Sequence, residues 1–380
     1  MTVRLHLKKP QAALLGALSV DPMSILSAEY AEAMLKAGTP ERTVDMPIGT
    51  GPFQMTSYQK DATIRFRAFD DYWAKTLYPE RAAAVKDLIF SITPDAGVRF
   101  AKVKSGECQI ARYPNPGDIP ALKADPNINL VSGTIADQSF LAFNQEKKPF
   151  GDRRVREALV YATNIPAIID AVYQGTGTQT AAQIPPTLWG HADLKPRPYD
   201  PAKAKQLLAE AGFPNGFKTT LWAIPVVRAY MPNGRRAAEL IQADWAKVGV
   251  EAQIVTYEWG EYLKRARAGE HDIAMLGYTW DYPDPSQILQ LGWSCDGVKS
   301  GSNRARWCNR DYSDLMDKAN EVSDQAERTK LYLRMQDIFQ EDVGGMLFAN
   351  AKAFTPIRKN VSGYKIHFFG GQPFSGVSIQ

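Results

Sequence analysis

NQEKKPFGDRRVREAL, residues 144–159, is the stretch that decides the fold of this chain. An apolar run, Phe140 to Phe143, ends just before it, and a polar turn that contains Pro149 and Gly151 follows. Asp152 stands where a helix N-cap is expected, and apolar residues recur behind it at helical spacing. The stretch therefore predicts a strand that passes through a turn into an amphipathic helix.

The segment from about 139 to 350 alternates between helical and strand patterns along its length. The expected helices cover residues 152–173, 201–212, 234–248, 258–268, 311–322 and 325–342. The expected strands cover residues 218–224, 250–256 and 272–277. Helices and strands in alternation are typical of an α/β architecture.

Residues near 57–138 form a second region of mixed pattern. Polar and apolar residues alternate from Thr63 to Phe69, which predicts a half-exposed strand. A second strand is expected at Val85 to Ile92 and a helix at Asp95 to Val103. This region is therefore also expected to be an α/β unit.

The first twenty residues allow two interpretations. Three basic residues precede an apolar run at residues 12–18, as the charged part of a signal peptide precedes its apolar part. We prefer a strand at Val3 to Leu7 followed by a short amphipathic helix, because the apolar run is short and contains a glycine. A further helix is expected around residues 27–34, before the Gly- and Pro-rich turn at 47–52.

Three further motifs occupy other parts of the chain. They are Gly49-Thr50-Gly51-Pro52-Phe53, Tyr199-Asp200-Pro201 and Asp244-Trp245-Ala246-Lys247-Val248-Gly249-Val250. Together with residues 144–159, and in the same order, they resemble segments of bacterial extracellular solute-binding proteins of family 5, the peptide receptors of ABC importers. The likeness runs through essentially all 380 residues, and within the family it is greatest to the dipeptide-binding members.

The resemblance implies a periplasmic-binding-protein-like fold of type II, cluster C, in which two α/β lobes close as a clamshell around a ligand. It also implies that the chain lacks the family's N-terminal part, including the signal peptide. On this interpretation residues 1–56 are the remnant of a small second domain. Residues 57–138 with 351–380 form the first lobe, and residues 139–350 form the large ligand-closing lobe.

Composition and charge argue against several classes of function. The net charge of +4 is small and evenly spread, which argues against a nucleic-acid partner, and no apolar run reaches the length of a transmembrane helix. The four histidines lie far apart, and neither a P-loop nor a Gly-x-Ser-x-Gly elbow occurs. We therefore expect no catalytic residues, no cofactor and no bound metal. The sequence leaves open an acidic pair for glycoside hydrolysis, but promotes no particular pair.

A zwitterionic peptide needs a fixed cation for its carboxylate, and Arg228 is the strongest candidate. Arg228 lies just after the strand expected at 218–224, in a loop with Pro225, where open α/β sheets place their ligands. A guanidinium matches a carboxylate bidentately and stays charged when it is desolvated. The resemblance implies that Arg228 grips the ligand's C-terminal carboxylate. Without the resemblance, a surface arginine paired with a nearby acid would be the simpler interpretation.

The anion for the ligand's ammonium is expected in the loop that follows the strand at 272–277. This loop reads Gly277-Tyr278-Thr279-Trp280-Asp281-Tyr282-Pro283-Asp284-Pro285. The resemblance implies that Asp281 holds the α-ammonium and that its aromatic neighbours supply wall and backbone contacts. The expected ligand-binding residues are therefore Arg228, Asp281, Tyr278, Thr279, Trp280, Gly277 and Trp222. Asp284 is interpreted as a turn residue before Pro285.

The three cysteines suggest one disulfide and one thiol without a partner. Cys295 and Cys308 enclose a loop rich in Gly, Ser and Asn at residues 296–306, and a disulfide that closes it would stabilise the fold by about 3 kcal/mol. Cys108 then has no partner in the chain. The resemblance implies that Cys108 pairs with a cysteine near the family's mature N-terminus. A buried free thiol in a cytosolic protein is the alternative.

The sequence thus predicts the larger, C-terminal part of a periplasmic dipeptide- or short-oligopeptide-binding protein. Such a protein delivers its ligand to the membrane permease subunits of an ABC importer, and we expect a monomer. One alternative is a receptor of the same family for another cargo, such as haem, glutathione or a metal chelate. The other is a hydrolase or a chaperone-like protein.

Overall fold

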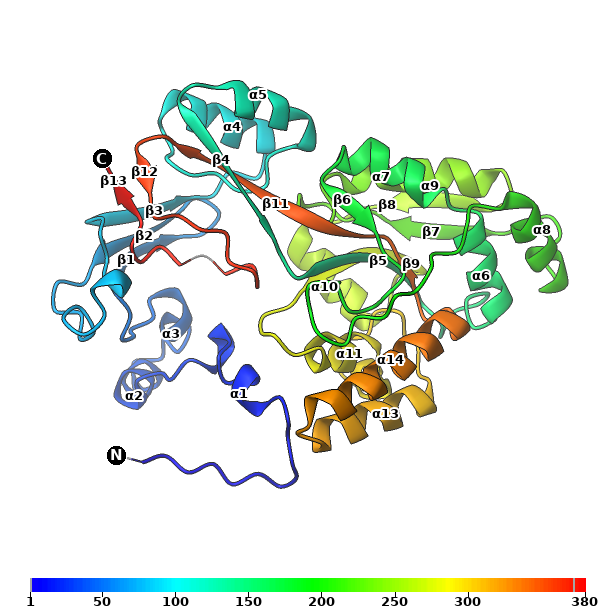
Figure 1. Cartoon of the computed structure of the whole chain (residues 1–380), viewed down its shortest axis with the longest axis horizontal. Helices are drawn as coiled ribbons and strands as arrows, with labels where there is room; N and C mark the ends of the chain where they lie inside the picture. Colours follow the sequence, from blue (N-terminus) through cyan, green and yellow to red (C-terminus); the bar gives the residue numbers. More distant parts are fainter. Residues whose placement is uncertain (1, 372) are drawn as a thin grey trace. The chain divides into compact units, whose positions relative to one another are not determined.

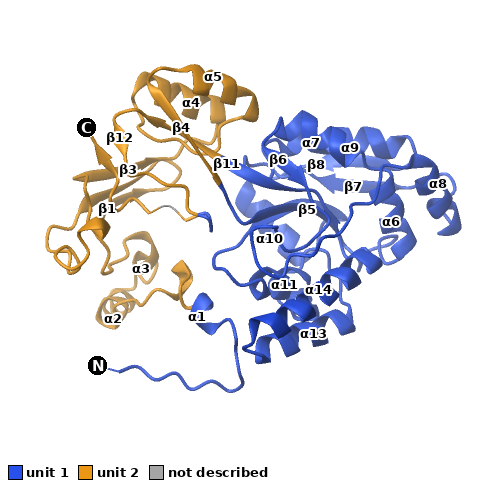
Figure 2. Cartoon of the chain, viewed as in Figure 1, with its two compact units in different colours: residues 1–17, 134–353, 368–370 blue, residues 18–133, 354–367, 371–380 orange. Residues whose placement is uncertain are grey.

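The computed structural model describes residues 2–371 and 373–380. Contacts between residues divide the chain into two compact units (Figure 2). Unit 1 comprises Met1–Ala17, Thr134–Ala353 and Phe368–Gly370, and unit 2 comprises Leu18–Gly133, Phe354–His367 and Gly371–Gln380. Residues 18–56 thus group with 57–133, and their origin in a separate second domain stays a prediction.

A five-stranded sheet forms the centre of unit 1 (Figure 1). Its strand order is β10-β5-β9-β7-β8; β7 is parallel to β8 and β9, and β5 is antiparallel to β9 and β10. The strands span Asp137–Phe143 (β5), Lys218–Trp222 (β7), Glu251–Val255 (β8), Ile273–Thr279 (β9) and Met346–Leu347 (β10). The three strands predicted between residues 218 and 277 are therefore present, with slightly different ends.

Both faces of this sheet are buried, because successive residues of a strand point to opposite sides. One face packs against the helices between residues 153 and 246 through Leu141, Phe143, Leu221, Ile273 and Met275. The other face packs against helices within residues 259–293 and 310–342 through Phe140, Ala142, Trp222, Ala274 and Leu276. Unit 1 is therefore an α/β sandwich of three layers.

Ten helices are described in unit 1, and most of them match predicted ranges. They span Leu14–Ala17 (α1), Arg153–Tyr161 (α6), Ile165–Tyr173 (α7), Pro201–Glu210 (α8), Gly234–Ala246 (α9), Trp259–Ala268 (α10), Ser286–Trp293 (α11), Cys295–Lys299 (α12), Arg310–Glu321 (α13) and Gln325–Asp342 (α14). The single helix predicted over residues 152–173 is wrong, because it divides into α6 and α7. The Asn164 side chain caps α7 by accepting the Ala167 N–H, and Pro166 has no N–H to continue α6.

Two of these helices lie where no helix is predicted. α11 follows the loop of Asp281 and buries an apolar stripe that includes Ile288 and Trp293. α12 occupies the start of the segment predicted as a loop at 296–306, and the Ser294 hydroxyl caps it by accepting the Gly297 N–H. The Gly- and Ser-rich composition of this segment conceals a capped helical turn.

Unit 2 contains the antiparallel sheet β1-β2-β3, in which Ile64 pairs with Phe90. Its elements span Ala28–Lys36 (α2), Arg42–Asp45 (α3), Phe53–Gln59 (β1), Thr63–Ala68 (β2), Asp87–Ser91 (β3), Ala96–Ser105 (α4), Ile119–Ala124 (α5), Ile128–Thr134 (β4), Val361–Ser362 (β12) and Ser378–Ile379 (β13). The strand β11 (Ala349–Arg358) runs from unit 1 into unit 2, pairing with β6 (Gly177–Gln179) in unit 1 and lying beside β4 in unit 2. The predicted strands β2 and β3 and the predicted helices α2 and α4 are confirmed, whereas β1 is not predicted.

The strand predicted at Val3 to Leu7 is wrong. Residues 2–7 have no regular secondary structure, and the side chains of Val3, Leu5 and Leu7 are exposed. A strand needs a hydrogen-bonded neighbour, and no strand in the described part of the chain pairs with this segment. The short helix α1 lies within the helix predicted behind it.

Asp137 is a fully buried carboxylic acid on β5, the first strand after the chain enters unit 1. Its Oδ1 accepts the N–H of Ala351 at 2.8 Å, and its Oδ2 has no hydrogen-bond partner among the described residues. Burial raises the pKa of the Asp137 carboxyl to about 8, because the surrounding protein disfavours the charged form. Asp137 is therefore protonated in the folded chain at neutral pH.

We predict that Asp137 makes the fold less stable as the pH rises. The folded state holds the Asp137 proton more tightly than the unfolded state does. The contribution of this proton to the free energy of unfolding is therefore present at low pH and is lost as the pH approaches about 8. Asp137→Asn keeps a neutral side chain, so its free energy of unfolding should fall less between pH 5 and 8 than that of the unmodified chain. The difference should be at least about 1 kcal/mol, because one unit of pKa corresponds to about 1.4 kcal/mol. Urea unfolding of both forms across this range tests the prediction, and parallel curves would contradict it.

A buried ion pair fixes α14 to the loop that carries Asp281. The Arg328 guanidinium donates two hydrogen bonds of 2.8 Å to the Asp284 carboxylate, and both side chains are largely buried. Asp284 also accepts the Ser286 N–H, so its predicted role in the turn is confirmed, but the long-range pair is not visible in the sequence.

We predict that Arg328→Ala lowers the free energy of unfolding by about 3–5 kcal/mol, because it leaves the Asp284 carboxylate buried without its cation. Arg334→Ala is the control, since Arg334 forms an exposed pair with Glu341 and should cost about 0–1 kcal/mol. Urea unfolding measures both, and equal losses would contradict the prediction.

Candidate functional site

Two loops leave the sheet of unit 1 at the ends of the parallel neighbours β7 and β9. The loop after β7 carries Arg228, and the loop after β9 carries Asp281. Because the carboxyl ends of parallel strands meet at one edge of a sheet, both loops rise from the same edge. The structure thus brings the predicted cation and anion onto adjacent loops.

Direct contact between these two segments comes from Tyr230 and Gly277. A Cβ atom at Gly277 would lie 2.3 Å from Cδ2 of the Tyr230 ring and 2.7 Å from the backbone oxygen of Gln138. The ring therefore lies against bare backbone of β9, an approach that only glycine allows. Gly277 is predicted as a ligand contact. Its lack of a side chain also allows the Arg228 loop to pack closely against β9.

Arg228 is half-buried and lies over an aromatic ring. Its guanidinium carbon is 5.4 Å from the centre of the Trp259 ring, and Nη1 donates to the Val227 carbonyl at 3.0 Å. The backbone groups of Arg228 and Met231 exchange two hydrogen bonds of 3.2 Å, which closes a tight turn. The loop thus holds a permanent cation in a defined orientation.

Asp281 is exposed, and Gln287 of α11 holds it in place. The Gln287 amide donates from Nε2 to Asp281 Oδ2 and accepts the Asp281 N–H through Oε1 at 2.9 Å. This two-point contact orients the carboxylate through its Oδ2 atom. Gln287 is not predicted as a site residue, because its only signal in the sequence is its position six residues after Asp281.

Tyr278 is predicted to form a wall of the site, and its ring lies between Phe140 and Trp293. Its hydroxyl donates to the Ser302 carbonyl at 3.3 Å. Burial raises the pKa of Tyr278 to about 12, so the hydroxyl remains a donor at physiological pH. A Cβ at Gly292 would lie 2.7 Å from this ring, so α11 packs closely against it.

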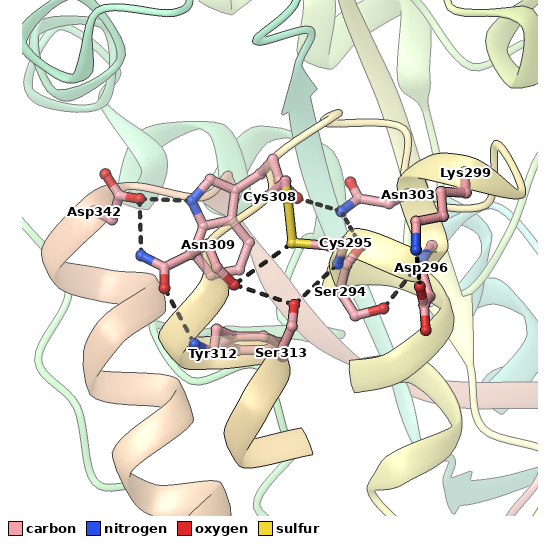
Figure 3. Close-up of a disulfide and its surroundings, with 12 residues drawn as sticks. Ser294, Cys295, Asp296, Lys299, Asn303, Cys308, Asn309, Tyr312, Ser313 and Asp342 are labelled. Carbon is pink, nitrogen blue, oxygen red and sulfur yellow. Dashed lines mark hydrogen bonds and ion pairs between the residues drawn. A yellow bond between two sulfur atoms is a disulfide. The ribbon is translucent and has the colours of Figure 1, made fainter. Parts of the chain in front are cut away.

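The segment that carries Ser302 is closed by the predicted disulfide between Cys295 and Cys308, shown in Figure 3. The Cα atoms of the two cysteines are 4.5 Å apart. Inside the closed segment, the Asn303 side chain donates to the carbonyls of Ser294 and Trp307 at 3.2 and 2.8 Å. The disulfide and this amide therefore support the backbone that receives the Tyr278 hydroxyl.

Trp222 and Trp280 are core residues in this structure, and their predicted ligand contacts stay predictions. Both indoles are almost fully buried in the core between the sheet and α10, α11, α13 and α14. Trp222 packs against Tyr257 and His271 at the end of β7. Neither indole therefore forms an exposed wall, and a backbone contact stays a prediction for Trp280. Thr279 is half-buried at the end of β9.

Unit 2 contains a cavity of about 530 Å³ that is separate from the two loops. Residues of β3, α4 and the segment 107–112 line it, and Cys108 is one of them. Cys108 forms no disulfide within residues 2–371 and 373–380. Burial raises the pKa of its thiol, which disfavours the reactive thiolate.

The described residues contain neither a membrane-spanning helix nor a cluster of metal ligands. Among them, no helix is long and apolar enough to cross a membrane. In the same residues, no three His, Cys, Asp or Glu side chains gather as they would around a metal ion.

We predict that Gly277→Ala destabilises the chain by about 1–3 kcal/mol, because the new methyl group must displace the Tyr230 ring or the β5 backbone. Gly51→Ala is the matched control, since its Cβ would meet open space and the change should stay within about 0.5 kcal/mol. Urea unfolding measures both variants. A Gly277→Ala chain as stable as the control would show that Tyr230 is not held against β9.

Comparison with known proteins places the chain in a family. Residues 1–300 match the family model described as "Bacterial extracellular solute-binding proteins, family 5 Middle". The "Dipeptide-binding protein" of Escherichia coli (strain K12) is 49% identical over 380 residues, which is 100% of this chain and 70% of that protein. The "Heme-binding protein A" of Haemophilus influenzae is 43% identical over 381 residues, covering 100% of this chain and 68% of that protein.

A solved structure agrees with this assignment. The dipeptide-binding protein of Pseudoalteromonas sp. SM9913, crystallised in complex with Met-Leu, superposes with a TM-score of 0.91 at 34% identity. The match covers 98% of this chain and 73% of that one. The α/β fold is that of type II periplasmic binding proteins, as predicted. The chain belongs to family 5 of the bacterial extracellular solute-binding proteins.

Proposed function

We propose that this chain is the substrate-binding component of an ABC peptide importer and that it binds free dipeptides or short peptides. The observation that carries the proposal is the placement of Arg228 and Asp281 on adjacent loops at one sheet edge. A free peptide carries a carboxylate at one end and an ammonium at the other, so the two fixed charges match its two termini. The names of relatives that are up to 49% identical support the same ligand class.

Each terminus of the peptide would meet a side chain that is already held. The peptide carboxylate would pair with the Arg228 guanidinium, whose orientation the Trp259 ring restricts. The ammonium would pair with Asp281, which Gln287 holds from behind. Groups held before binding lose less conformational entropy when the ligand arrives, so more of the interaction energy appears as affinity.

The remaining parts of the function follow from the ligand and the family. We propose that the chain works in the periplasm, delivers peptides to membrane permease subunits and catalyses no reaction. We also propose that it acts as a monomer, since a single clamped ligand requires no second copy.

A second candidate is a receptor for another cargo, because one relative at 43% identity is named for haem. A fixed cation and a fixed anion favour a zwitterion over an extended apolar ring. Titration with haemin beside a dipeptide distinguishes the two ligand classes.

We predict that Arg228→Ala and Asp281→Asn each weaken the binding of a free dipeptide. Loss of one charge leaves its peptide partner buried and uncompensated, which costs about 2–5 kcal/mol, or roughly 30-fold to several thousand-fold in Kd. Calorimetric titration of the chain with Met-Leu and Ala-Ala measures the change.

Arg235→Ala is the matched control, because Arg235 forms an exposed pair with Glu239 on α9 and should leave Kd unchanged. Binding of haemin but of no peptide would replace the peptide proposal with the other cargo. If both Arg228→Ala and Asp281→Asn still bind the dipeptide with unchanged Kd, the proposed roles of the two charges are wrong. The assignment as a peptide receptor would then remain without them.

A further inference from the structure

A chain of buried hydroxyl groups runs behind the Arg228 loop. The Tyr173 hydroxyl lies 2.5 Å from the Tyr230 carbonyl oxygen and 2.8 Å from the Ser139 hydroxyl. The Ser139 hydroxyl in turn lies 3.2 Å from the backbone N–H of Ala349. Ser139, Tyr173 and Ala349 are fully buried, and Tyr230 is 7% exposed. These groups join four segments of unit 1, namely β5, α7, β11 and the loop after β7.

The chemistry of the groups fixes the direction of the hydrogen bond between Tyr173 and Tyr230. A carbonyl oxygen only accepts, so the single hydroxyl hydrogen of Tyr173 points to Tyr230. The Tyr173 oxygen can then accept from Ser139 at 2.8 Å, and the Ala349 carbonyl at 3.2 Å is a second acceptor for the Ser139 hydroxyl hydrogen. The Ser139 oxygen remains free to accept the Ala349 N–H. The result is one connected series of hydrogen bonds from Ala349 through Ser139 and Tyr173 to Tyr230.

The Tyr173 ring fits closely in its place. A Cβ at Gly177, at the start of β6, would lie 2.5 Å from the ring. Burial also raises the pKa of Tyr173 well above the ordinary tyrosine value, so its hydroxyl stays a donor at any physiological pH. Neither the position of the hydroxyl nor its proton is therefore free to vary.

The series ends on the residue that places the Arg228 loop. Tyr230 contributes its ring to the contact with Gly277 and its carbonyl to the bond with Tyr173. The loop from Arg228 to Met231 is closed by its own backbone bonds, so a shift of Tyr230 moves Arg228 with it.

The other end of the series lies on the strands that connect the two units. The chain passes from unit 2 back into unit 1 at Thr134, just before β5, and passes into unit 2 again after Ala353, within β11. Ser139 lies on β5 and Ala349 lies on β11, and the Phe348 N–H also donates to the Ser139 carbonyl at 2.8 Å. The series of hydrogen bonds thus links the Arg228 loop to β5 and β11, the strands through which the chain passes between the two units.

We propose that Tyr173 is a positioning residue for ligand capture, which fixes the Arg228 loop to the connecting strands β5 and β11 through its hydroxyl. Tyr173 acts through Tyr230 and Arg228 and does not touch the ligand. The proposal rests on the peptide-binding function and deepens it. It assigns selectivity for a free C-terminal carboxylate to a buried residue behind the site.

Tyr173→Phe tests the proposal, because it keeps the ring and removes only the hydroxyl. The readout is Kd for a free dipeptide and for the same dipeptide with a C-terminal amide, measured by calorimetry on the full chain. We expect the variant to bind the free dipeptide about tenfold more weakly, because a buried carbonyl loses its donor and the loop shifts. Affinity for the amide should stay unchanged, since that ligand has no carboxylate for Arg228. A purely structural role would weaken both ligands equally and would overturn the proposal.

A double-mutant cycle separates action through Arg228 from a general effect. In an Arg228→Ala background, Tyr173→Phe should cause no further loss of dipeptide affinity, and additive losses would overturn the proposal. Tyr312→Phe is the matched control, because it removes another fully buried tyrosine hydroxyl in the core on the opposite face of the sheet. It should leave both affinities unchanged.

A second variant keeps the test decisive if Tyr173→Phe does not fold. Ser139→Ala removes the hydroxyl that links Tyr173 to Ala349 and should shift the same dipeptide-to-amide ratio in the same direction by a smaller factor. An unchanged ratio in Ser139→Ala would count against the series.

If the unmodified chain binds the free dipeptide and the amide equally, the proposed role of Arg228 is wrong, and this inference is wrong with it. If Arg228→Ala abolishes the preference for the free dipeptide but Tyr173→Phe leaves it intact, the peptide function stands and this inference is wrong.

Discussion

Burial of the central sheet on both faces is the constraint on which the rest of unit 1 depends. Leu221 and Trp222 are successive residues of β7, yet they belong to two different cores. A slip of one residue would exchange the two sets of side chains, so the register of β7 against β9 is tightly fixed. The register in turn fixes where each strand ends and therefore where Arg228 and Asp281 emerge. Apolar packing of the strands therefore determines the positions of the loops that carry Arg228 and Asp281.

Much of this arrangement is readable in the sequence, because apolar runs and turn residues are local signals. They predict β7, β8 and β9 and the placement of Arg228 and Asp281 after strand ends. The contact between Tyr230 and Gly277 is partly readable, since a glycine inside a strand often marks close approach of another segment. The division of helix 152–173 is harder to see, because Asn164 and Pro166 start a second helix within an unbroken helical pattern.

Other features are beyond sequence reasoning because they join distant residues. Arg328 and Asp284 are separated by 44 positions, and nothing local marks them as partners. The buried indole of Trp280 could not be predicted for a different reason. An aromatic residue beside a charged loop is as typical of a core as of a ligand wall. The candidate site therefore combines charged heads that the sequence identifies with supports such as Gln287 and Tyr173 that only the fold brings into place.

Disulfides form in oxidising compartments and are rare in the cytosol. The segment closed by Cys295 and Cys308 carries Ser302, whose carbonyl receives the Tyr278 hydroxyl. In a newly made chain with reduced cysteines, this support of the β9 loop would rest on non-covalent contacts alone. In a protein that works in the periplasm, as proposed above, the covalent part of this support would form only after the chain leaves the reducing cytosol.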